Sequence, residues 1–161
     1  MQGVRELQPV WRLSFNAFRA VRCLMDEIQL TRKIMTTPYI HGGRDFEGAD
    51  CYGAIILWYR HRLGIELWDL EAGYPADWKQ SKNLFIENYY RQWLRVERPK
   101  RHDIVLIRIT AERLHAGIFM GQGKFLHLCQ AGGVLSPVDD RRWKSRLEGF
   151  YRFKKLNEDH N

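Results

Sequence analysis

The hydrophobic and polar positions divide the chain into a first part with helical spacing and a second part rich in short apolar runs. Near the N-terminus, apolar residues recur at roughly helical spacing, which predicts an amphipathic helix. These residues are Leu7, Trp11, Phe15, Phe18, Val21, Leu24, Met25 and Ile28.

The next elements follow from one long apolar run and its stop signals. We expect a loop as far as Asp50, which is a suitable N-cap, and then a helix from Cys51 to Leu63 that Gly64 ends. A second helical region is expected between about Asp77 and Trp93, because Pro99 then marks a break.

Short apolar runs bounded by turn residues predict strands in the rest of the chain. They cover about Asp103 to Ile109, Leu114 to Met120, Lys124 to Cys129, Gly133 to Val138 and Gly149 to Lys154. The run DDRRWKSRL between the last two is expected to be a short helix or loop. Helices followed by a series of strands are typical of an α+β fold, in which the helices cover one face of an antiparallel sheet.

The amino-acid composition indicates a globular, basic protein. Its 161 residues, of which 45% are hydrophobic, suffice for one domain with its own core. Three cysteines, an odd number, argue against a disulfide framework. The net charge of +7 favours polyanionic partners, but the densest basic group, Arg95 to Arg101, carries no nucleic-acid-binding motif. We therefore expect no specific nucleic-acid partner.

The N-terminal region has no long apolar stretch, because arginines interrupt it. We expect neither a signal peptide nor a transmembrane segment. Residues 1–34 are predicted to be a helical extension and residues 35–161 the functional domain. The extension either packs on this domain or docks on a partner protein or a membrane surface, and a native start at Met35 instead of Met1 remains open.

The candidate chemistry lies in one cysteine and two histidines. A Gly-rich loop presents Cys51 at the start of the apolar helix, where backbone N–H groups stabilise an anion and are expected to lower the thiol pKa. His115 and His127 lie in two apolar runs split by a Gly-containing turn, so that a hairpin can bring them side by side. One histidine would then be the base for the thiol and the other would orient it.

Competing interpretations of these residues are weaker. Cys23 and Cys129 are read as core residues, because cysteine is often buried. A zinc site of His41, Cys51, His115 and His127 lacks any short ligand pair, and no glycine motif fits a phosphate loop. We expect no metal and no cofactor.

Four short motifs resemble the NlpC/p60 superfamily of papain-like cysteine peptidases, which cut peptidoglycan stem peptides. They are PYIHGG, DCYG, HAGI and FLH, and the resemblance covers about Thr37 to Phe153. It implies a papain-like α+β fold with helices packed on an antiparallel sheet of about five or six strands, plus the extra N-terminal helix.

The resemblance also assigns roles to residues. Cys51 looks like the nucleophile, His115 the general base and His127 the residue that orients it. Tyr39 matches a tyrosine that helps to hold the substrate or the oxyanion, and Asp50 matches a carboxylate on the substrate side of the cleft. The implied reaction is hydrolysis of the amide between D-γ-glutamate and a diamino acid through a cysteine acyl-enzyme.

Two positions depart from the family pattern. His102 stands where a glycine is usual before the first strand of the sheet, and Tyr52 stands where a small serine is common. The second change is expected to narrow the substrate cleft or to alter its specificity.

The compact form of these motifs is more similar to the tail-associated peptidases of bacteriophages than to secreted enzymes. Such a protein is made in the cytoplasm without a signal peptide, assembled with tail-tip proteins into a virion, and carried to the cell wall. Two alternatives remain open: a structural tail-tip or adaptor subunit that retains the fold, and an acyltransferase on the same fold.

Overall fold

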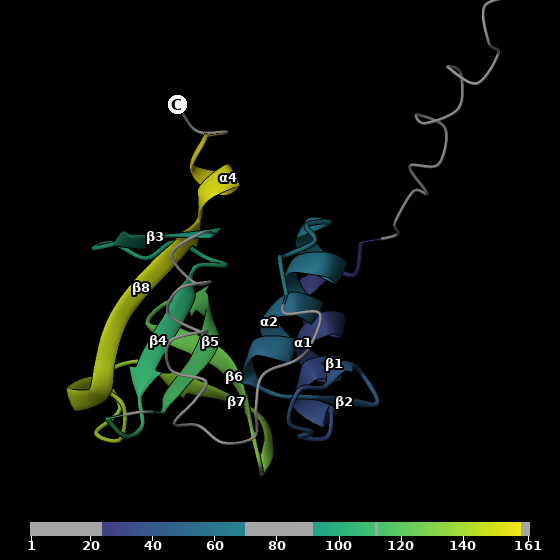
Figure 1. The fold of residues 1–161 in the computed structure, drawn as a ribbon, viewed down its shortest axis with the longest axis horizontal. Coiled ribbons are helices and arrows are strands. Elements are labelled where there is room, and N and C mark those ends of the chain that lie inside the picture. Colours follow the sequence, from purple (N-terminus) through teal and green to yellow (C-terminus); the bar gives the residue numbers. More distant parts are fainter. Residues whose placement is uncertain (1–23, 70–91, 112, 159–161) are drawn as a thin grey trace, which may run out of the picture.

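The computed structural model describes residues 24–69, 92–111 and 113–158, and the fold is drawn in Figure 1. Two layers build it, a helical layer and a six-stranded sheet. The helical layer contains α1 (Glu27–Thr36), the two-stranded ribbon of β1 (Arg44–Asp45) and β2 (Gly48–Ala49), and α2 (Cys51–Trp58).

The sheet has the order β3-β8-β4-β5-β6-β7, and every neighbouring pair is antiparallel. This confirms the expected α+β fold and the predicted strand count. The strands are β3 (Trp93–Val96), β4 (Ile104–Arg108), β5 (Leu114–Gly121), β6 (Lys124–Cys129), β7 (Gly132–Pro137) and β8 (Leu147–Phe153). A short 3₁₀ turn, η3 (Lys144–Arg146), precedes β8, and α4 (Lys154–Glu158) follows it.

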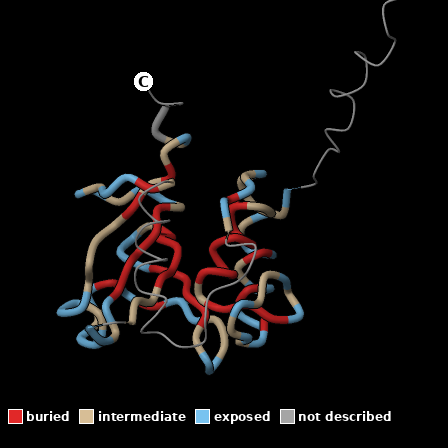
Figure 2. Tube along the Cα trace, viewed as in Figure 1, coloured by how far each residue is buried: buried red, intermediate tan, exposed pale blue. Residues whose placement is uncertain are grey.

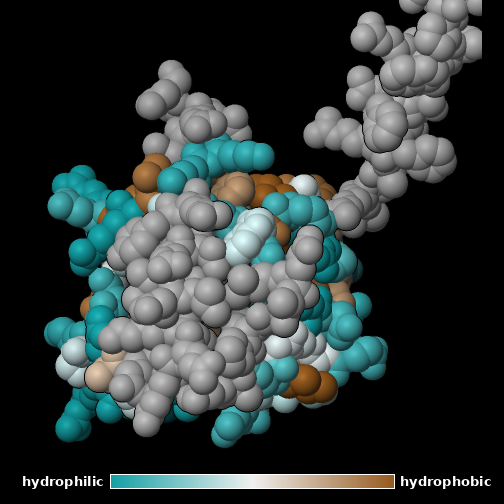
Figure 3. All heavy atoms as spheres, viewed as in Figure 1, coloured by the Kyte–Doolittle hydropathy of each residue, from teal (hydrophilic) through white to brown (hydrophobic). Residues whose placement is uncertain are grey.

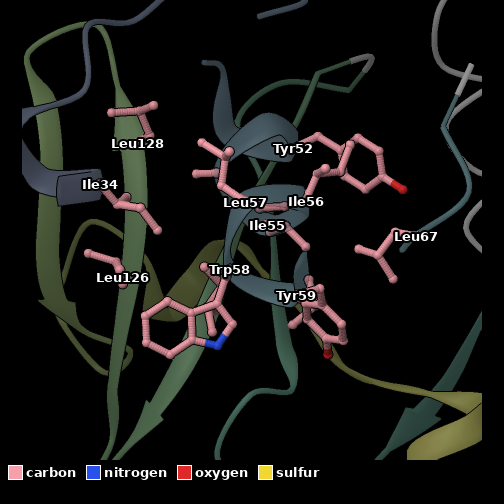
Figure 4. Close-up of a cluster of buried hydrophobic side chains, with 14 of the residues drawn as sticks. Ile34, Tyr52, Ile55, Ile56, Leu57, Trp58, Tyr59, Leu67, Leu126 and Leu128 are labelled. Carbon is pink, nitrogen blue, oxygen red and sulfur yellow. The ribbon is translucent and has the colours of Figure 1, made fainter. Parts of the chain in front are cut away.

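Helix α2 is the centre of the core. Every residue from Tyr52 to Trp58 is buried, as expected for a helix that is apolar on all sides. The helix continues as a π-helical turn, η2 (Tyr59–Leu63), and ends at Gly64, whose left-handed φ of 68° explains the stop signal in the sequence. Figure 4 shows the α2 side chains between Leu126 and Leu128 of β6 on one side and Leu67 on the other.

The sheet is apolar on both faces. The face toward the helices carries residues such as Ile118, Leu126 and Leu128, and a smaller cluster lies on the other face. Figure 2 shows that buried stretches run along the central strands and along the helix beside them. This second cluster consists of Val105, Ile107, Phe119, Phe125 and Val138. Each fully buried side chain of this size contributes about 1.5–3 kcal/mol, so the two clusters together hold the sheet in a fixed position against α2.

Helix α1 packs on the end of the sheet near β7. Asp26 caps it by accepting a hydrogen bond from the Gln29 N–H at 2.9 Å, and Leu30 and Ile34 are fully buried. The predicted boundary between residues 34 and 35 falls within this helix. Most of the predicted amphipathic helix lies outside the described residues, so the division into an extension and a domain stays a prediction.

One predicted element differs from the structure. The second helical region was expected to reach Trp93, but Trp93 begins strand β3, with its side chain buried and the next two residues exposed. This alternation has the period of a strand, and pairing with β8 satisfies the backbone. Residues 77–91 of that prediction lie outside the described residues.

The described surface is largely polar. Figure 3 shows hydrophilic side chains over much of the described surface on one face, with separate apolar patches. Among the described residues, no helix is long and apolar enough to cross a membrane.

His102 explains why a glycine is usual at its position. Its backbone is left-handed, with φ 77°, a conformation that costs a non-glycine residue about 1–2 kcal/mol. The side chain offsets this cost, because Nδ1 accepts a hydrogen bond from the Trp58 indole at 3.1 Å.

We expect His102→Ala to destabilise the fold by about 1–3 kcal/mol, since it keeps the strained backbone and leaves the buried Trp58 N–H without this acceptor. His102→Gly loses the same bond but relieves the backbone, so it should be about 1 kcal/mol more stable than the alanine variant. Urea unfolding of both variants and the wild type measures the difference. An alanine variant as stable as the glycine variant would contradict the backbone explanation.

Candidate active site

A tightly packed ribbon delivers Cys51 to the start of α2. The β1–β2 ribbon lies directly on the first helical turn, because a Cβ on Gly53 would lie only 2.2 Å from the Gly43 carbonyl oxygen. Ahead of the ribbon, Tyr39 forms a parallel bridge with Ala49. Two glycines therefore allow the loop and the helix to approach closely enough to fix the position of Cys51.

Asp50 caps the helix, as predicted. Its Oδ1 accepts from the Gly53 N–H at 2.7 Å, and its Oδ2 accepts from the Gly42 N–H at 2.8 Å. Arg44 adds an ion pair at 3.1 Å, and the residue is only 1% exposed. These contacts make Asp50 a structural anchor of the loop, and its predicted place on the substrate side of the cleft stays a prediction.

His115 and His127 lie side by side, as expected for a hairpin. His115 comes from β5 and His127 from the neighbouring β6, and His115 Nε2 lies 2.9 Å from His127 Nδ1. The two rings are nearly perpendicular, at 86°.

Gly117 makes this contact possible. A Cβ at this position would lie 2.9 Å from the His127 Cβ and 2.7 Å from the Phe125 ring. Without a side chain there, the rings of β6 can lie over β5, and the His127 ring stacks on Phe125 with centroids 4.6 Å apart. The glycine of the HAGI motif is therefore a requirement of close packing.

The thiol lies against the strand that carries His115. Cys51 hydrogen-bonds to the backbones of Tyr52 and of Ala116, the residue that follows His115. Because His127 occupies His115 Nε2, a proton from the thiol would have to go to the other ring nitrogen, Nδ1. The structure brings the two histidines into contact and places Cys51 beside their strand, and the catalytic roles of the three residues stay a prediction.

Ser136 is a fourth member of this group, and sequence reasoning missed it. It is 3% exposed on β7, and its Oγ lies 3.0 Å from His127 Nε2. In the β6–β7 ladder Ser136 pairs with Phe125, which shares a strand face with His127. Pairing the predicted strands Lys124 to Cys129 and Gly133 to Val138 in the correct register would have placed Ser136 beside His127.

The chain of contacts fits two arrangements of protons, because a serine hydroxyl can donate or accept. If Ser136 Oγ accepts from His127 Nε2–H, then His127 Nδ1 accepts from His115 Nε2–H, and His115 Nδ1 keeps its lone pair. The reversed chain places a proton on that Nδ1 and prevents it from acting as a base. We therefore expect Ser136 to accept from His127 and so to favour the tautomer in which His115 can act as a base.

We expect Ser136→Ala to lower kcat/KM about tenfold, because second-sphere hydrogen bonds of this kind are worth roughly 10–100-fold. Ser136→Thr keeps the hydroxyl and should retain most activity. Nitrogen chemical shifts of the His127 ring distinguish this role from simple loss of packing, since a tautomer change exchanges the shifts of Nδ1 and Nε2 and loss of packing does not. Unchanged shifts together with unchanged activity in Ser136→Ala would contradict the assignment.

Trp143 covers the two histidines on their outer side. Its ring stacks on His115 at 22° and meets His127 edge-on at 80°. It comes from the DDRRWKSRL segment, which forms turns and η3 as expected. This aromatic cover reduces the contact of both imidazoles with water.

Burial controls the protonation of the site. Burial and, second, the neighbouring Asp50 charge raise the pKa of Cys51 to about 11. Burial and, second, the His127 charge lower the pKa of His115 to about 3, and burial lowers the pKa of His127 to about 4. The sequence predicted a lowered thiol pKa, but loss of hydration outweighs the helix N-terminus. At neutral pH the thiol and both imidazoles are therefore uncharged.

These pKa values predict that the protein loses stability in mild acid. Below an ordinary histidine pKa of about 6.5, the unfolded chain takes up protons that the folded His115 and His127 do not. Lowering the pH from 7 to 5 should reduce the free energy of unfolding by about 3 kcal/mol through this pair.

Urea unfolding at both pH values tests this, with the double variant His115→Asn/His127→Asn as the control. The double variant should lose much less stability between pH 7 and pH 5. His102, whose pKa burial also lowers, accounts for a residual slope in both proteins. Equal losses in the two proteins would contradict the prediction.

The remaining candidate residues lie as follows. Burial and then the Cys51 charge raise the pKa of Tyr39, and its role in holding the substrate or the oxyanion stays a prediction. Tyr52 is 8% exposed and its hydroxyl donates to the Trp68 carbonyl at 2.9 Å, so it supports the helix from inside. Cys129 is half-buried with its thiol 3.3 Å from the Gly132 carbonyl, and Cys23 lies outside the described residues. Within the described ranges, no cluster of three or more His, Cys, Asp or Glu could hold a metal ion.

The sequence matches a family model over most of this region. Residues 36–152 match the NlpC/P60 family. The curated relatives include the gamma-DL-glutamyl hydrolase of Bacillus subtilis, 28% identical over 133 residues, which are 80% of this chain and 29% of that protein. They also include the murein DD-endopeptidase MepS/murein LD-carboxypeptidase of Escherichia coli, 28% identical over 109 residues, or 67% of this chain and 51% of that protein.

Two further similarities concern a viral protein and a solved fold. The tail tip assembly protein K of Escherichia phage N15 is 30% identical over 86 residues, which are 48% of this chain and 34% of that protein. The chain spans about half or less of each of these relatives. A solved NlpC/P60 family protein from Bacillus cereus superposes with a TM-score of 0.56 at 20% identity, over 78% of this chain and 38% of that one.

Proposed function

Because this chain belongs to the NlpC/P60 family, we propose that it is a cysteine peptidase that hydrolyses an amide bond in the stem peptides of peptidoglycan. The observation that carries this proposal is the position of Cys51. It begins a buried helix and hydrogen-bonds to the strand that carries His115, whose ring contacts His127 and, through it, Ser136. Nucleophile, base and orienting group are the three parts that acyl transfer requires.

In the proposed acylation step, the sulfur of Cys51 attacks the amide carbonyl carbon while its proton moves to His115 Nδ1. His127 stabilises the imidazolium that forms, because it accepts the hydrogen bond from His115 Nε2–H. The carbonyl oxygen becomes an oxyanion, and the N–H of Cys51 with the Tyr39 hydroxyl are the proposed donors. Each such donor is worth about 3 kcal/mol in comparable sites.

The acyl-enzyme then forms when the C–N bond breaks and His115 gives its proton to the departing amine. A water molecule repeats the attack, with His115 as the base, and the thioester bond breaks to return the thiol. Starting from an uncharged pair, each step moves one proton between sulfur, imidazole and substrate, and the site keeps the same total charge.

For the bond itself, we propose the amide between D-γ-glutamate and a diamino acid. The name of one relative supports this choice, since it is called a gamma-DL-glutamyl hydrolase. The other relative is called a murein DD-endopeptidase/LD-carboxypeptidase, a name that supports a peptidoglycan substrate but specifies DD and LD bonds. Both similarities are partial, so the bond is a proposal to be tested on defined substrates.

We further propose that the protein acts as a component of a phage tail that opens the cell wall during infection. Support comes from the partial similarity to a tail tip assembly protein. In this proposal the protein is made in the cytoplasm and assembled with tail-tip proteins. The part of the N-terminal extension ahead of α1 docks on them, since α1 itself packs on the sheet.

Digestion of purified peptidoglycan, with the released muropeptides analysed by mass spectrometry, tests the function. Fragments that end at D-glutamate on one side and begin with the diamino acid on the other would establish the endopeptidase. Products carrying an added amine would instead identify an acyltransferase. A folded wild type that releases nothing and also leaves defined muropeptides intact would favour a structural tail-tip or adaptor subunit.

A further inference from the structure

A buried carboxylate immediately precedes the nucleophile. Asp50 is 1% exposed and adjoins Cys51, so its negative charge opposes the formation of negative charge on the sulfur. The proposed reaction passes through a state with thiolate character. Such a state needs a cation that offsets Asp50.

Arg44 is placed to supply this cation. Its Nη1 donates to Asp50 Oδ1 at 3.1 Å and to the Gly43 carbonyl at 2.8 Å. Its Nε and Nη2 donate to Asp69 at 2.6 and 3.3 Å. The guanidinium carbon also lies 5.5 Å from the centre of the Tyr52 ring. This planar group therefore has its orientation fixed from three sides.

The position of its strand keeps Arg44 within hydrogen-bonding distance of Asp50. It lies on β1, and the β1–β2 ribbon packs against α2, as Figure 1 shows. The side chain is 20% exposed, whereas Asp69 is 30% exposed. The ion pair with Asp50 is thus the better shielded of the two, and its electrostatic effect on the site is the larger.

We propose that Arg44 is a positioning residue of the active site, which neutralises Asp50 and fixes the ribbon so that negative charge can develop on Cys51. The inference rests on the proposed role of Cys51 as the nucleophile. Nothing in the sequence motifs pointed to this arginine, because its partners are six and 25 positions away along the chain.

The electrostatics of the thiol agree with this role. The Asp50 charge raises the pKa of Cys51, whereas the Arg44 charge lowers it. Other titratable or charged groups near the thiol or its neighbour Tyr39, among the described residues, include His115, His127, Arg113 and Cys129. Arg44 contacts Asp50 directly, and its charge lowers the thiol pKa.

The test measures the rate of Cys51 alkylation by iodoacetamide between pH 7 and pH 10, with the modified cysteine identified by mass spectrometry. Arg44→Met should lower the rate at pH 8.5 about tenfold, as expected for a thiol pKa raised by about one unit. Adding Asp50→Asn, which keeps the helix cap, should restore the rate to within about threefold of the wild type. Arg44→Lys keeps the positive charge but loses the planar set of donors of the guanidinium, so its alkylation rate should lie between those of Arg44→Met and the wild type.

Arg60→Met is the matched control, because Arg60 forms an exposed ion pair with Glu66 and does not contact Asp50. In this variant iodoacetamide should alkylate Cys51 at the wild-type rate. An Arg44→Met profile equal to that of the wild type would overturn the proposal, and so would a double variant as slow as the single one. Alkylation needs no peptidoglycan, so these outcomes are separate from success or failure of the proposed hydrolysis.

Discussion

Cys51→Ala should abolish the release of muropeptides, with a fall in kcat of at least about 10⁴-fold. The physical reason is that alanine cannot form the acyl-enzyme, and the remaining groups can only polarise the substrate. The effect should be confined to chemistry, since Cys51 is the first residue of α2 and the Asp50 cap does not use its side chain.

The measurement is digestion of purified peptidoglycan by wild type and variant at equal concentration, followed by mass spectrometry of the soluble fragments. Thermal unfolding of the variant within a few degrees of the wild type serves as the folding control. Cys129→Ala is the matched substitution, because that thiol is half-buried and contacts only the Gly132 carbonyl among its described hydrogen bonds. Retained activity in Cys51→Ala would remove the nucleophile from the proposal.

The second large effect concerns the base. His115→Ala should lower kcat by about 10³–10⁴-fold, because proton transfer from sulfur and to the leaving amine both depend on this imidazole. His127→Ala should cost about 10–100-fold, since it removes orientation and stabilisation of the imidazolium but leaves the base in place.

Steady-state kinetics on a defined muropeptide would measure both variants. His61→Ala provides a histidine control away from the site, on η2. The ratio between the two losses is the decisive quantity. If His127→Ala were as inactive as His115→Ala, the assignment of base and orienting residue along the 2.9 Å contact would have to be revised.

The fold could be predicted to a large extent from local signals. The helix from Cys51 to Gly64 was visible because a cap, an apolar run and a left-handed glycine all coincide there. The strands β4 to β8 were visible because apolar runs alternate with turn residues. Strand β3 was missed because only four residues form it, and its pairing with β8 joins positions more than fifty residues apart.

For the candidate site too, local signals in the sequence indicated some residues and only the structure showed the others. The sequence alone singled out Cys51, His115 and His127 as candidates, since a cysteine at a helix start and two histidines on a predicted hairpin are local patterns. The HAGI motif also contains Gly117, but only the structure gives a reason for this glycine, which is the space for the His127 ring.

Only the tertiary structure decided what surrounds these residues. Ser136, Trp143 and Arg44 reach the site from β7, the turns before β8, and β1, and no short motif links them to the cysteine. The tertiary structure also reversed the expected thiol pKa. A helix N-terminus is a local property that can be read from the sequence, whereas burial depends on how distant segments pack, and at Cys51 burial is the larger effect.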